Sequence, residues 1–287
     1  MSMSWNKLLN EDRLCRPKNR PLRPEGLNPF FEDEDRIVFS QPFRRLKDKT
    51  QVHPLSDNDH VRTRLTHSLE VAAIGEALGN LVGNVLTHRG SILNTRAADI
   101  GMIVRAACLA HDIGNPPFGH VGEFAIREWF GMKIKSLKKL NAHQKADLCN
   151  FDGNAQGFRI VTELENYKGD GGLQLTYVTL AALMKYPWSS IADPTGQRKF
   201  GFNESELKYA KTVADKVGLI ELKPDKKGKK GMNRWCRHPL AYLVEAADDI
   251  CYSIIDLEDG VEMGAFTFEM YENLIKEFIK SDNSQKQ

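Results

Sequence analysis

The chain has 287 residues, a length that fits one large domain or two small ones, and 41% of its residues are hydrophobic. Its 40 Lys and Arg residues nearly balance 38 Asp and Glu residues, which excludes an overall polycation and leaves phosphate or nucleic-acid binding to local patches. The mean hydropathy is −0.44, and no uninterrupted apolar run reaches the roughly 18 residues of a membrane span, so no membrane partner is expected. The five scattered cysteines lack CxxC spacing, which predicts reduced thiols in a cytoplasmic protein.

The first 30 residues contain Pro17, Pro21, Pro24 and Pro29 together with several charges. Because proline lacks the backbone N–H that a helix interior requires, residues 1–30 are predicted to form an extended arm rather than a packed helix. Residues 31–280 are expected to form the main domain, with Lys-rich insertions near 131–150 and 221–234.

Apolar residues recur at helical spacing along most of this domain, whereas no strand-like alternation is long enough to build a large sheet. The second of the predicted helices is strongly apolar and is expected to be buried, with Gly114-Asn115-Pro116-Pro117 after its end. We therefore predict an all-α fold. The predicted helices cover residues 61–88, 97–112, 119–130, 153–164, 175–185 and 205–217, followed by a long helix that begins at Pro239.

Two histidines and two aspartates on these apolar helices form a candidate metal site: His67, His111, Asp112 and Asp248. Two imidazoles with two carboxylates are a mixed N/O ligand set that suits Mn, Fe, Co, Ni, Zn or Mg. A buried carboxylate needs a partner or a metal ion, which gives these positions a chemical explanation. Taken singly, each residue also fits an ordinary structural role, and the spacing alone is a loose pattern.

The sequences around these residues resemble the HD-domain deoxynucleoside triphosphate triphosphohydrolases, the dGTPase family. The resemblance is carried by RTRLTHSLEV (62–71), LAHDIGNPPFGHVGE (109–123) and HPLAYLVEAADDICYSIIDLED (238–259), and HDIGNPPFGH is its most specific part. DGNAQGFRI, LTYVTLAALMKYP and RKFGF match as well, so the similarity extends from about residue 28 to 262. It implies an all-α HD-domain fold and hydrolysis of a dNTP, with dGTP favoured, to deoxynucleoside and triphosphate.

The resemblance also implies roles for individual residues. His67, His111, Asp112 and Asp248 correspond to the ligands of one divalent ion, Mn, Mg or another transition metal. The pair His120 and Glu123 corresponds to residues that assist attack and proton transfer at the α-phosphate. Substrate contacts are implied for Arg64 at the phosphates, for Gln51 near the base and sugar, and for Tyr252 and Asp256 at the deoxyribose.

The spacing of these residues agrees with shared helix faces. Arg64 lies three residues before His67, and His120 lies three residues before Glu123, so each pair can face one way. Asp248, Tyr252 and Asp256 recur every four residues, which favours Asp248 over Asp249 as the ligand. Lys185, before Tyr186-Pro187, is interpreted either as a phosphate contact or as a cation that stabilises a helix C-terminus.

Two departures from the family pattern affect the expected activity. Many relatives carry a histidine where this chain has Gly153, which shifts the expected proton transfer onto His120. Family members are also considerably longer, and their C-terminal region, which contributes base contacts and much of the oligomer interface, is absent from this chain.

Other functions remain open at this stage. The alternatives are another HD-type nucleotide phosphohydrolase and a truncated, inactive subunit that regulates or binds nucleic acid. The Lys-rich segments 133–145 and 223–230 are the features that would bind single-stranded DNA. The resemblance implies a homo-oligomer, since relatives form hexamers.

Overall fold

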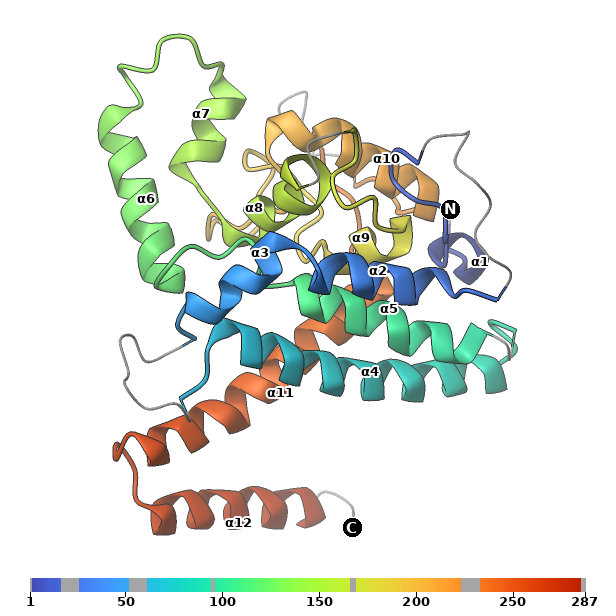
Figure 1. The fold of residues 1–287 in the computed structure, drawn as a ribbon, viewed down its shortest axis with the longest axis vertical. Helices are drawn as coiled ribbons and strands as arrows, with labels where there is room; N and C mark the ends of the chain where they lie inside the picture. The colour runs from blue at the N-terminus through green and yellow to red at the C-terminus, as the bar shows by residue number, and fades with distance from the viewer. Residues whose placement is uncertain are drawn as a thin grey trace.

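The computed structural model describes residues 2–16, 26–51, 61–93, 96–165, 169–222 and 233–284, apart from the side chains of residues 255, 256 and 278–284. Within these ranges the chain is helical, and β-pairing is limited to isolated bridges such as Arg13 with Thr176. This confirms the all-α fold class (Figure 1). The helices are α1 (Trp5–Leu8), α2 (Pro29–Val38), α3 (Gln41–Arg44), η1 (Arg45–Asp48), α4 (Arg64–His88), α5 (Ala97–Ala110), α6 (Gly119–Lys133), α7 (Ala142–Cys149), α8 (Gly153–Arg159), the π-helical turn η3 (Ile160–Leu164), α9 (Tyr177–Leu183), η4 (Glu204–Glu206), α10 (Leu207–Val217), α11 (Pro239–Glu262) and α12 (Phe268–Ser284).

The helices that supply the candidate site have clear local start signals. A reciprocal capping box between Thr63 and Thr66 begins α4, so the helix starts one residue later at Arg64. Helix α11 begins with Pro239 at its first position, and the His238 side chain accepts a hydrogen bond from the Leu240 N–H. These caps fix where the helical register starts and therefore which residues face inward.

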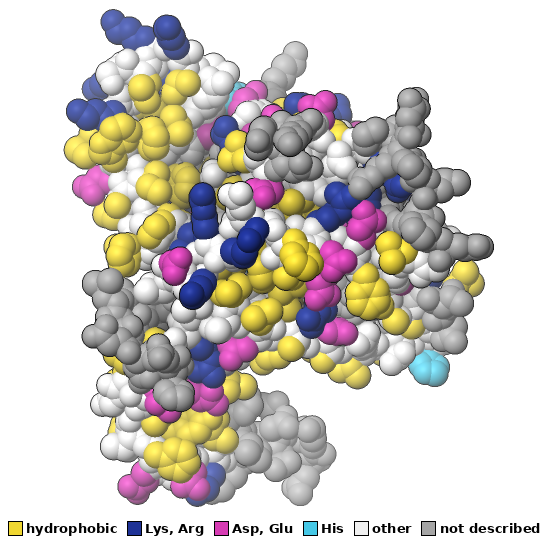
Figure 2. Space-filling view, in the orientation of Figure 1, with side chains coloured by type: hydrophobic (Ala, Val, Ile, Leu, Met, Phe, Trp, Pro, Cys, Tyr) yellow, Lys and Arg dark blue, Asp and Glu magenta, His cyan; other side chains and the backbone are white. Residues whose placement is uncertain are grey.

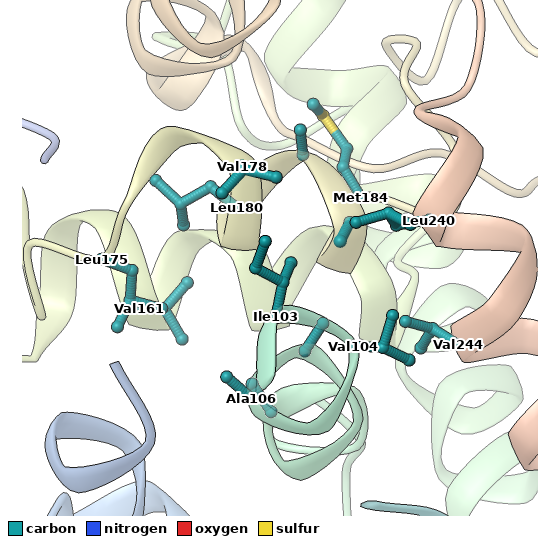
Figure 3. Close-up of a cluster of buried hydrophobic side chains, with 14 of the residues drawn as sticks. Ile103, Val104, Ala106, Val161, Leu175, Val178, Leu180, Met184, Leu240 and Val244 are labelled. Atoms are coloured by element: carbon teal, nitrogen blue, oxygen red, sulfur yellow. The ribbon is translucent and has the colours of Figure 1, made fainter. Parts of the chain in front are cut away.

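The core is organised around α5, which packs against α4, α2, α9 and α11. Nine of its residues are buried, as its strongly apolar sequence predicts. Figure 3 shows Ile103 and Val104 of α5 meeting side chains of α9 and α11, among them Val178 and Val244. Helices α4, α5 and α11 pack against one another, and the candidate site described below takes residues from all three.

Helix α4 is the one described helix whose length and composition would allow it to cross a membrane, with a mean hydropathy of 1.2 over its most apolar 18 residues. Long helices of soluble proteins share these properties. The buried side chains of Arg64 and His67 in its first turn belong to the polar site described below, and the helix packs along α5.

The described part of the predicted N-terminal arm differs from the prediction. Residues 5–8 form α1, and Leu8, Leu9 and Leu14 are each at most 2% exposed. The buried guanidinium of Arg13 pairs with Asp33 of α2. The prediction of an arm that is not packed is therefore wrong for residues 2–16. Three leucines in this stretch bury their side chains in the core, and the prolines on which the prediction rested begin only at residue 17. Residues 17–25 lie outside the described ranges.

Helix α7 lies inside the segment 131–150, where the sequence has little periodicity, and it packs against α6 and η4. Its carboxylate Asp147 accepts hydrogen bonds from the Ser190 hydroxyl and the Glu204 N–H. Most of the second Lys-rich insertion, residues 223–232, lies outside the described ranges.

Candidate functional site

Three helices bring two imidazoles and one carboxylate together. His67 lies in the first turn of α4, His111 directly follows α5, and Asp248 lies in α11. Asp248 Oδ1 is 3.1 Å from His67 Nε2 and 3.7 Å from His111 Nε2. One ligand atom from each residue lies within 4.8 Å of the other two, which is close enough for all three to contact one ion.

The hydrogen bonding of His111 tests whether a metal ion fits this group. Its Nδ1–H donates to the Cys108 carbonyl at 2.6 Å, so in the neutral form of the ring Nε2 has a free lone pair. That Nε2 is buried and has no hydrogen-bond partner among the described residues. A buried acceptor without a partner costs free energy, whereas a metal ion beside His67 and Asp248 would satisfy it. The residues present therefore fit a divalent metal ion.

Asp112 lies at the edge of this group. Its Oδ1 is 3.5 Å from His111 Nε2, while Oδ2 accepts a hydrogen bond from Arg64 Nη1 and Oδ1 accepts one from Asn115 Nδ2. Burial by itself would raise the pKa of Asp112, but the neighbouring His111 and Arg64 outweigh it and lower that pKa. The carboxylate is thus held ionised beside the proposed metal ligands.

Asp248 also has a lowered pKa. Desolvation acts to raise its pKa, but the hydrogen bond with His67 and the charge of His111 together lower the pKa to about 2. The adjacent Asp249 is exposed and makes no contact with either histidine among the described interactions. Of the four-residue series, Asp248 is the residue for which the structure gives a contact with His67.

A cavity of about 450 Å³ opens beside these residues. Its volume is in the range of small-molecule sites. It collects residues that are far apart in the chain, from the segment before α4 to the middle of α11. The lining residues are Gln51, Arg64, His111, Asp112, Asn115, Gly119, His120, Glu123, Asn154, Ala182, Leu183, Lys185, Tyr186, Lys199, Ala241, Val244, Glu245, Asp248, Asp249 and Tyr252.

His120 and Glu123 both line the cavity, but their side chains have different surroundings. His120 is exposed, whereas Glu123 is 3% exposed. Glu123 Oε1 accepts the Gly153 N–H at 2.7 Å, and Oε2 accepts from Arg127 at 3.2 Å. No hydrogen bond joins His120 to Glu123 in the described part of the chain, so orientation of the imidazole by this carboxylate stays a prediction.

Three further predicted residues lie on the cavity wall. Gln51 has a buried Oε1 without a partner among the described residues, so it is available to a ligand. Tyr252 lies one turn after Asp248 and is 61% exposed as a residue. Lys185 lies 3.3 Å from Glu245 through its Nζ, and although burial opposes it, the charges of Tyr186 and Glu245 raise the Lys185 pKa. The side chain of Asp256 lies outside the described part.

Sequence reasoning missed several lining residues, notably Lys199, Asn115 and Asn154. Lys199 places its Nζ 3.5 Å from Glu123 Oε2 and 3.7 Å from Asp152 Oδ2. All three lie in segments that already stood out, RKFGF, HDIGNPPFGH and DGNAQGFRI, yet only the structure shows that they meet at one cavity.

Comparison with known proteins gives an HD domain over residues 64–149. This match begins with the first residue of α4 and ends with the last residue of α7, so it includes His67, His111 and Asp112. Asp248 lies beyond it and joins the site through the packing of α11 against α4 and α5.

The chain is 47% identical over 287 residues to a deoxyguanosinetriphosphate triphosphohydrolase-like protein of Pseudomonas aeruginosa (strain LESB58), covering 98% of this chain and 62% of that protein. A protein of the same name from Synechocystis sp. is 47% identical over 295 residues, with 99% and 66% covered. A deoxyguanosinetriphosphate triphosphohydrolase of Cronobacter sakazakii is 34% identical over 307 residues, with 94% and 57% covered. The chain thus spans less than two thirds of the length of these relatives.

Proposed function

Because this chain belongs to the HD-domain family of deoxyguanosinetriphosphate triphosphohydrolase-like proteins, we propose that it is a metal-dependent hydrolase of dNTPs. The proposed reaction breaks the bond between the α-phosphorus and the 5′ oxygen, and dGTP is the proposed favoured substrate. The observation that carries this proposal is the buried Nε2 of His111, which has no hydrogen-bond partner among the described residues and lies beside His67 and Asp248 at the wall of a 450 Å³ cavity.

The metal would be held by His67, His111 and Asp248, with Asp112 as the proposed fourth ligand. A bound divalent ion would polarise a nonbridging oxygen of the α-phosphate. His111 is held in position by its bond to the Cys108 carbonyl, and Asp112 is held by Arg64 and Asn115. These residues place their ligand atoms before an ion arrives, which reduces the reorganisation that binding requires.

The cations in the cavity wall are the proposed triphosphate contacts. Arg64 keeps its Nε buried without a partner among the described residues, and Lys185 and Lys199 line the same cavity. Each lysine faces a carboxylate in the structure, Glu245 and Glu123 respectively. A polyanionic triphosphate would compete for these ammonium groups, and a guanidinium binds phosphate oxygens in a fixed geometry.

Proton transfer is assigned to His120. A water oxygen forms a bond to the α-phosphorus, the bond to the 5′ oxygen breaks, and that oxygen takes up one proton, which gives a deoxynucleoside and triphosphate. His120 is exposed at the cavity wall, so its imidazole can exchange protons with solvent between turnovers. The Glu123 carboxylate is held in place by the Gly153 N–H and by Arg127, which both donate to it.

The deoxyribose is proposed to lie between Gln51 and Tyr252. An aromatic ring packed against the 2′ carbon would leave no room for a hydroxyl group there, and this would favour deoxyribose over ribose. The Oε1 of Gln51, which has no partner among the described residues, is the proposed acceptor for a sugar hydroxyl or a base N–H. Asp256 remains the proposed partner of the 3′ hydroxyl.

The decisive experiment is to incubate the purified chain with each dNTP and Mn²⁺ or Mg²⁺ and to separate the products by chromatography. The proposal expects equal amounts of deoxynucleoside and inorganic triphosphate, and His111→Ala should abolish both metal binding and turnover. His88→Ala is the matched control, because His88 is an exposed histidine at the far end of α4. Release of phosphate or pyrophosphate would instead indicate another HD phosphohydrolase, and full activity of His111→Ala would refute the site.

A nucleic-acid-binding role is the second candidate. The exposed lysines Lys133, Lys135 and Lys138 lie at the end of α6 and just after it, and Phe124 and Trp129 of this helix are more than half exposed. Figure 2 shows apolar side chains gathered over α6, with basic side chains at its upper end. Salt-sensitive binding of single-stranded DNA without dNTP hydrolysis would favour this role. The homo-oligomer and the cytoplasmic location stay predictions.

A further inference from the structure

Asn115 connects the two halves of the candidate site. It lies in the turn after α5, and its Nδ2–H donates to Asp112 Oδ1, the oxygen that faces His111. Its backbone carbonyl accepts a hydrogen bond from Lys49 Nζ at 2.6 Å, and its backbone N–H donates to the Asp112 carbonyl at 3.1 Å. The backbone of Asn115 is therefore fixed by hydrogen bonds at its N–H and its carbonyl. Its side-chain amide can move only by breaking the hydrogen bond to Asp112.

Both oxygens of Asp112 have a fixed donor. Arg64 holds Oδ2, and Asn115 holds Oδ1. A carboxylate oxygen has two lone pairs, so Oδ1 can accept from Asn115 and still direct one lone pair toward the space beside His111 Nε2. Without Asn115 the carboxylate could rotate about its bond to the β-carbon, with Arg64 as its remaining hydrogen-bond donor.

The position of the Asn115 amide depends on the absence of a side chain at residue 153. A β-carbon placed on Gly153 would lie 2.0 Å from Asn115 Oδ1 and 3.1 Å from Glu123 Oε1. The first distance is far inside van der Waals contact, so any larger residue at position 153 would displace the amide. Gly157, one turn further along α8, has ordinary contacts of 3.4 Å or more.

We propose that Asn115 is a positioning residue of the candidate metal centre, that its amide fixes the Asp112 carboxylate for the ion, and that Gly153 leaves the space in which this amide lies. The inference rests on the proposed metal-dependent function. The inference gives a reason for glycine at position 153, because a side chain there would clash with the Asn115 amide in its present orientation.

The test is the affinity of the EDTA-treated chain for Mn²⁺, measured by isothermal titration calorimetry. Asn115→Ala should weaken binding by about 10-fold or more, which is the usual effect of removing a residue that orients a metal ligand. Asn115→Asp keeps the shape but replaces the donor with a repelling carboxylate, so it should weaken binding further. Asn154→Ala is the matched control, because its side chain lines the same cavity but donates to Asp152 instead.

Gly153→Ala tests the second half of the inference without altering any residue that touches Asp112. It should weaken Mn²⁺ binding about as much as Asn115→Ala, whereas Gly157→Ala should leave binding unchanged. Gly153→Ala combined with Asn115→Ala should bind about as well as Asn115→Ala alone, because the displaced amide is already gone. Circular dichroism on each variant verifies that it is folded.

Wild-type affinity in both Asn115→Ala and Asn115→Asp would overturn the role of Asn115, and wild-type affinity in Gly153→Ala would overturn the role of Gly153. Additive losses in the double variant would also contradict the shared mechanism. If the wild-type chain binds Mn²⁺ but hydrolyses no dNTP, the proposed function fails while the Asn115 comparison still stands. If the wild-type chain binds no Mn²⁺, both proposals fail.

Discussion

Asp248 and Asp249 show how one residue of a pair becomes part of a site. The two carboxylates are adjacent on α11, but Asp248 lies 3.1 Å from His67 Nε2 while Asp249 is exposed. In a helix, neighbouring residues point about 100° apart, so one of the two can face α4 while the other faces away.

We expect Asp248→Asn to weaken Mn²⁺ binding by more than about 100-fold, because an amide removes the negative charge from the ligand set. Asp249→Asn should retain Mn²⁺ binding within about 3-fold, since that side chain is outside the group. Titration calorimetry on both variants checks this. Equal losses in the two variants would contradict the assignment of Asp248.

His238 joins the start of α11 to helix α1 through a neutral ring. Its Nε2–H donates to the Leu8 carbonyl at 3.2 Å, and its Nδ1 accepts the Leu240 N–H at 3.1 Å. Complete burial outweighs the bond to Leu8 and lowers the pKa of His238 to about 4, from an ordinary value of 6.5. Protonation would place a donor against the Leu240 N–H.

This residue makes stability depend on pH in a defined window. Between pH 6.5 and 4 the unfolded chain binds a proton at His238 that the folded chain does not bind, so stability is full above about 6.5 and falls as pH drops toward 4. The loss is roughly 3 kcal/mol. Urea unfolding from pH 7 to 4 should show a steeper decline in the wild type than in His238→Asn. If the unfolding free energy fell equally with pH in the two proteins, the assignment of this pH dependence to His238 would be contradicted.

At the scale of elements, α4 and α5 approach closely because α4 presents glycines to its neighbour. A β-carbon on Gly79 would lie 2.7 Å from the Gly101 α-carbon, and one on Gly83 would lie 2.2 Å from the Ala97 carbonyl oxygen. Both are backbone contacts, which cannot rotate away as a side chain can. The close approach keeps the start of α4 and the end of α5 in register, and these two segments carry His67 and His111.

Gly83→Ala should therefore destabilise the fold by about 1–3 kcal/mol, although alanine is the better helix former. Gly131→Ala on α6 is the matched control, because nothing lies within 4 Å of its added methyl group, and it should be neutral or stabilising by up to about 1 kcal/mol. Urea unfolding measures both. A stabilising Gly83→Ala would show that α4 and α5 can separate without cost.

At the scale of the whole molecule, a buried ion pair joins segments that are distant in sequence. Arg13 and Asp33 are 4% and 0% exposed, and Arg13 also donates to the carbonyls of Pro29 and Gln174. The Thr176 hydroxyl and N–H donate to Asp33. The N-terminal segment, α2 and the start of α9 are thus held by one polar cluster within the core.

Arg13→Ala should cost about 3–5 kcal/mol of unfolding free energy, because it leaves the Asp33 carboxylate buried without its cation. Lys138 is exposed, so Lys138→Ala should change the free energy of unfolding by less than about 0.5 kcal/mol. Chemical denaturation compares the two. A loss below about 1 kcal/mol for Arg13→Ala would mean that the N-terminal segment is not part of the cooperative fold.

The helices that could be predicted from sequence are those with their own apolar repeat. Helices α4, α5, α6, α10 and α11 were found in this way, with boundaries within a few residues. Helix α7 has a weak repeat, and its Asp147 is partnered by Ser190 and Glu204 from distant segments. The packing of residues 2–16 also depends on contacts with distant segments, because this stretch forms backbone hydrogen bonds with residues near 174–178. A local apolar repeat does not reveal such contacts.

The sequence by itself determined the all-α class, the main helices and the residue types of the site, because helical periodicity and ligand chemistry are properties of short segments. Only the tertiary structure decided which atoms meet: that Asp112 is bound by Arg64 and Asn115, that Glu123 is bound by Gly153 and Arg127, and that Lys199 enters the cavity. These contacts depend on how distant helices pack, and the local sequence does not contain that information.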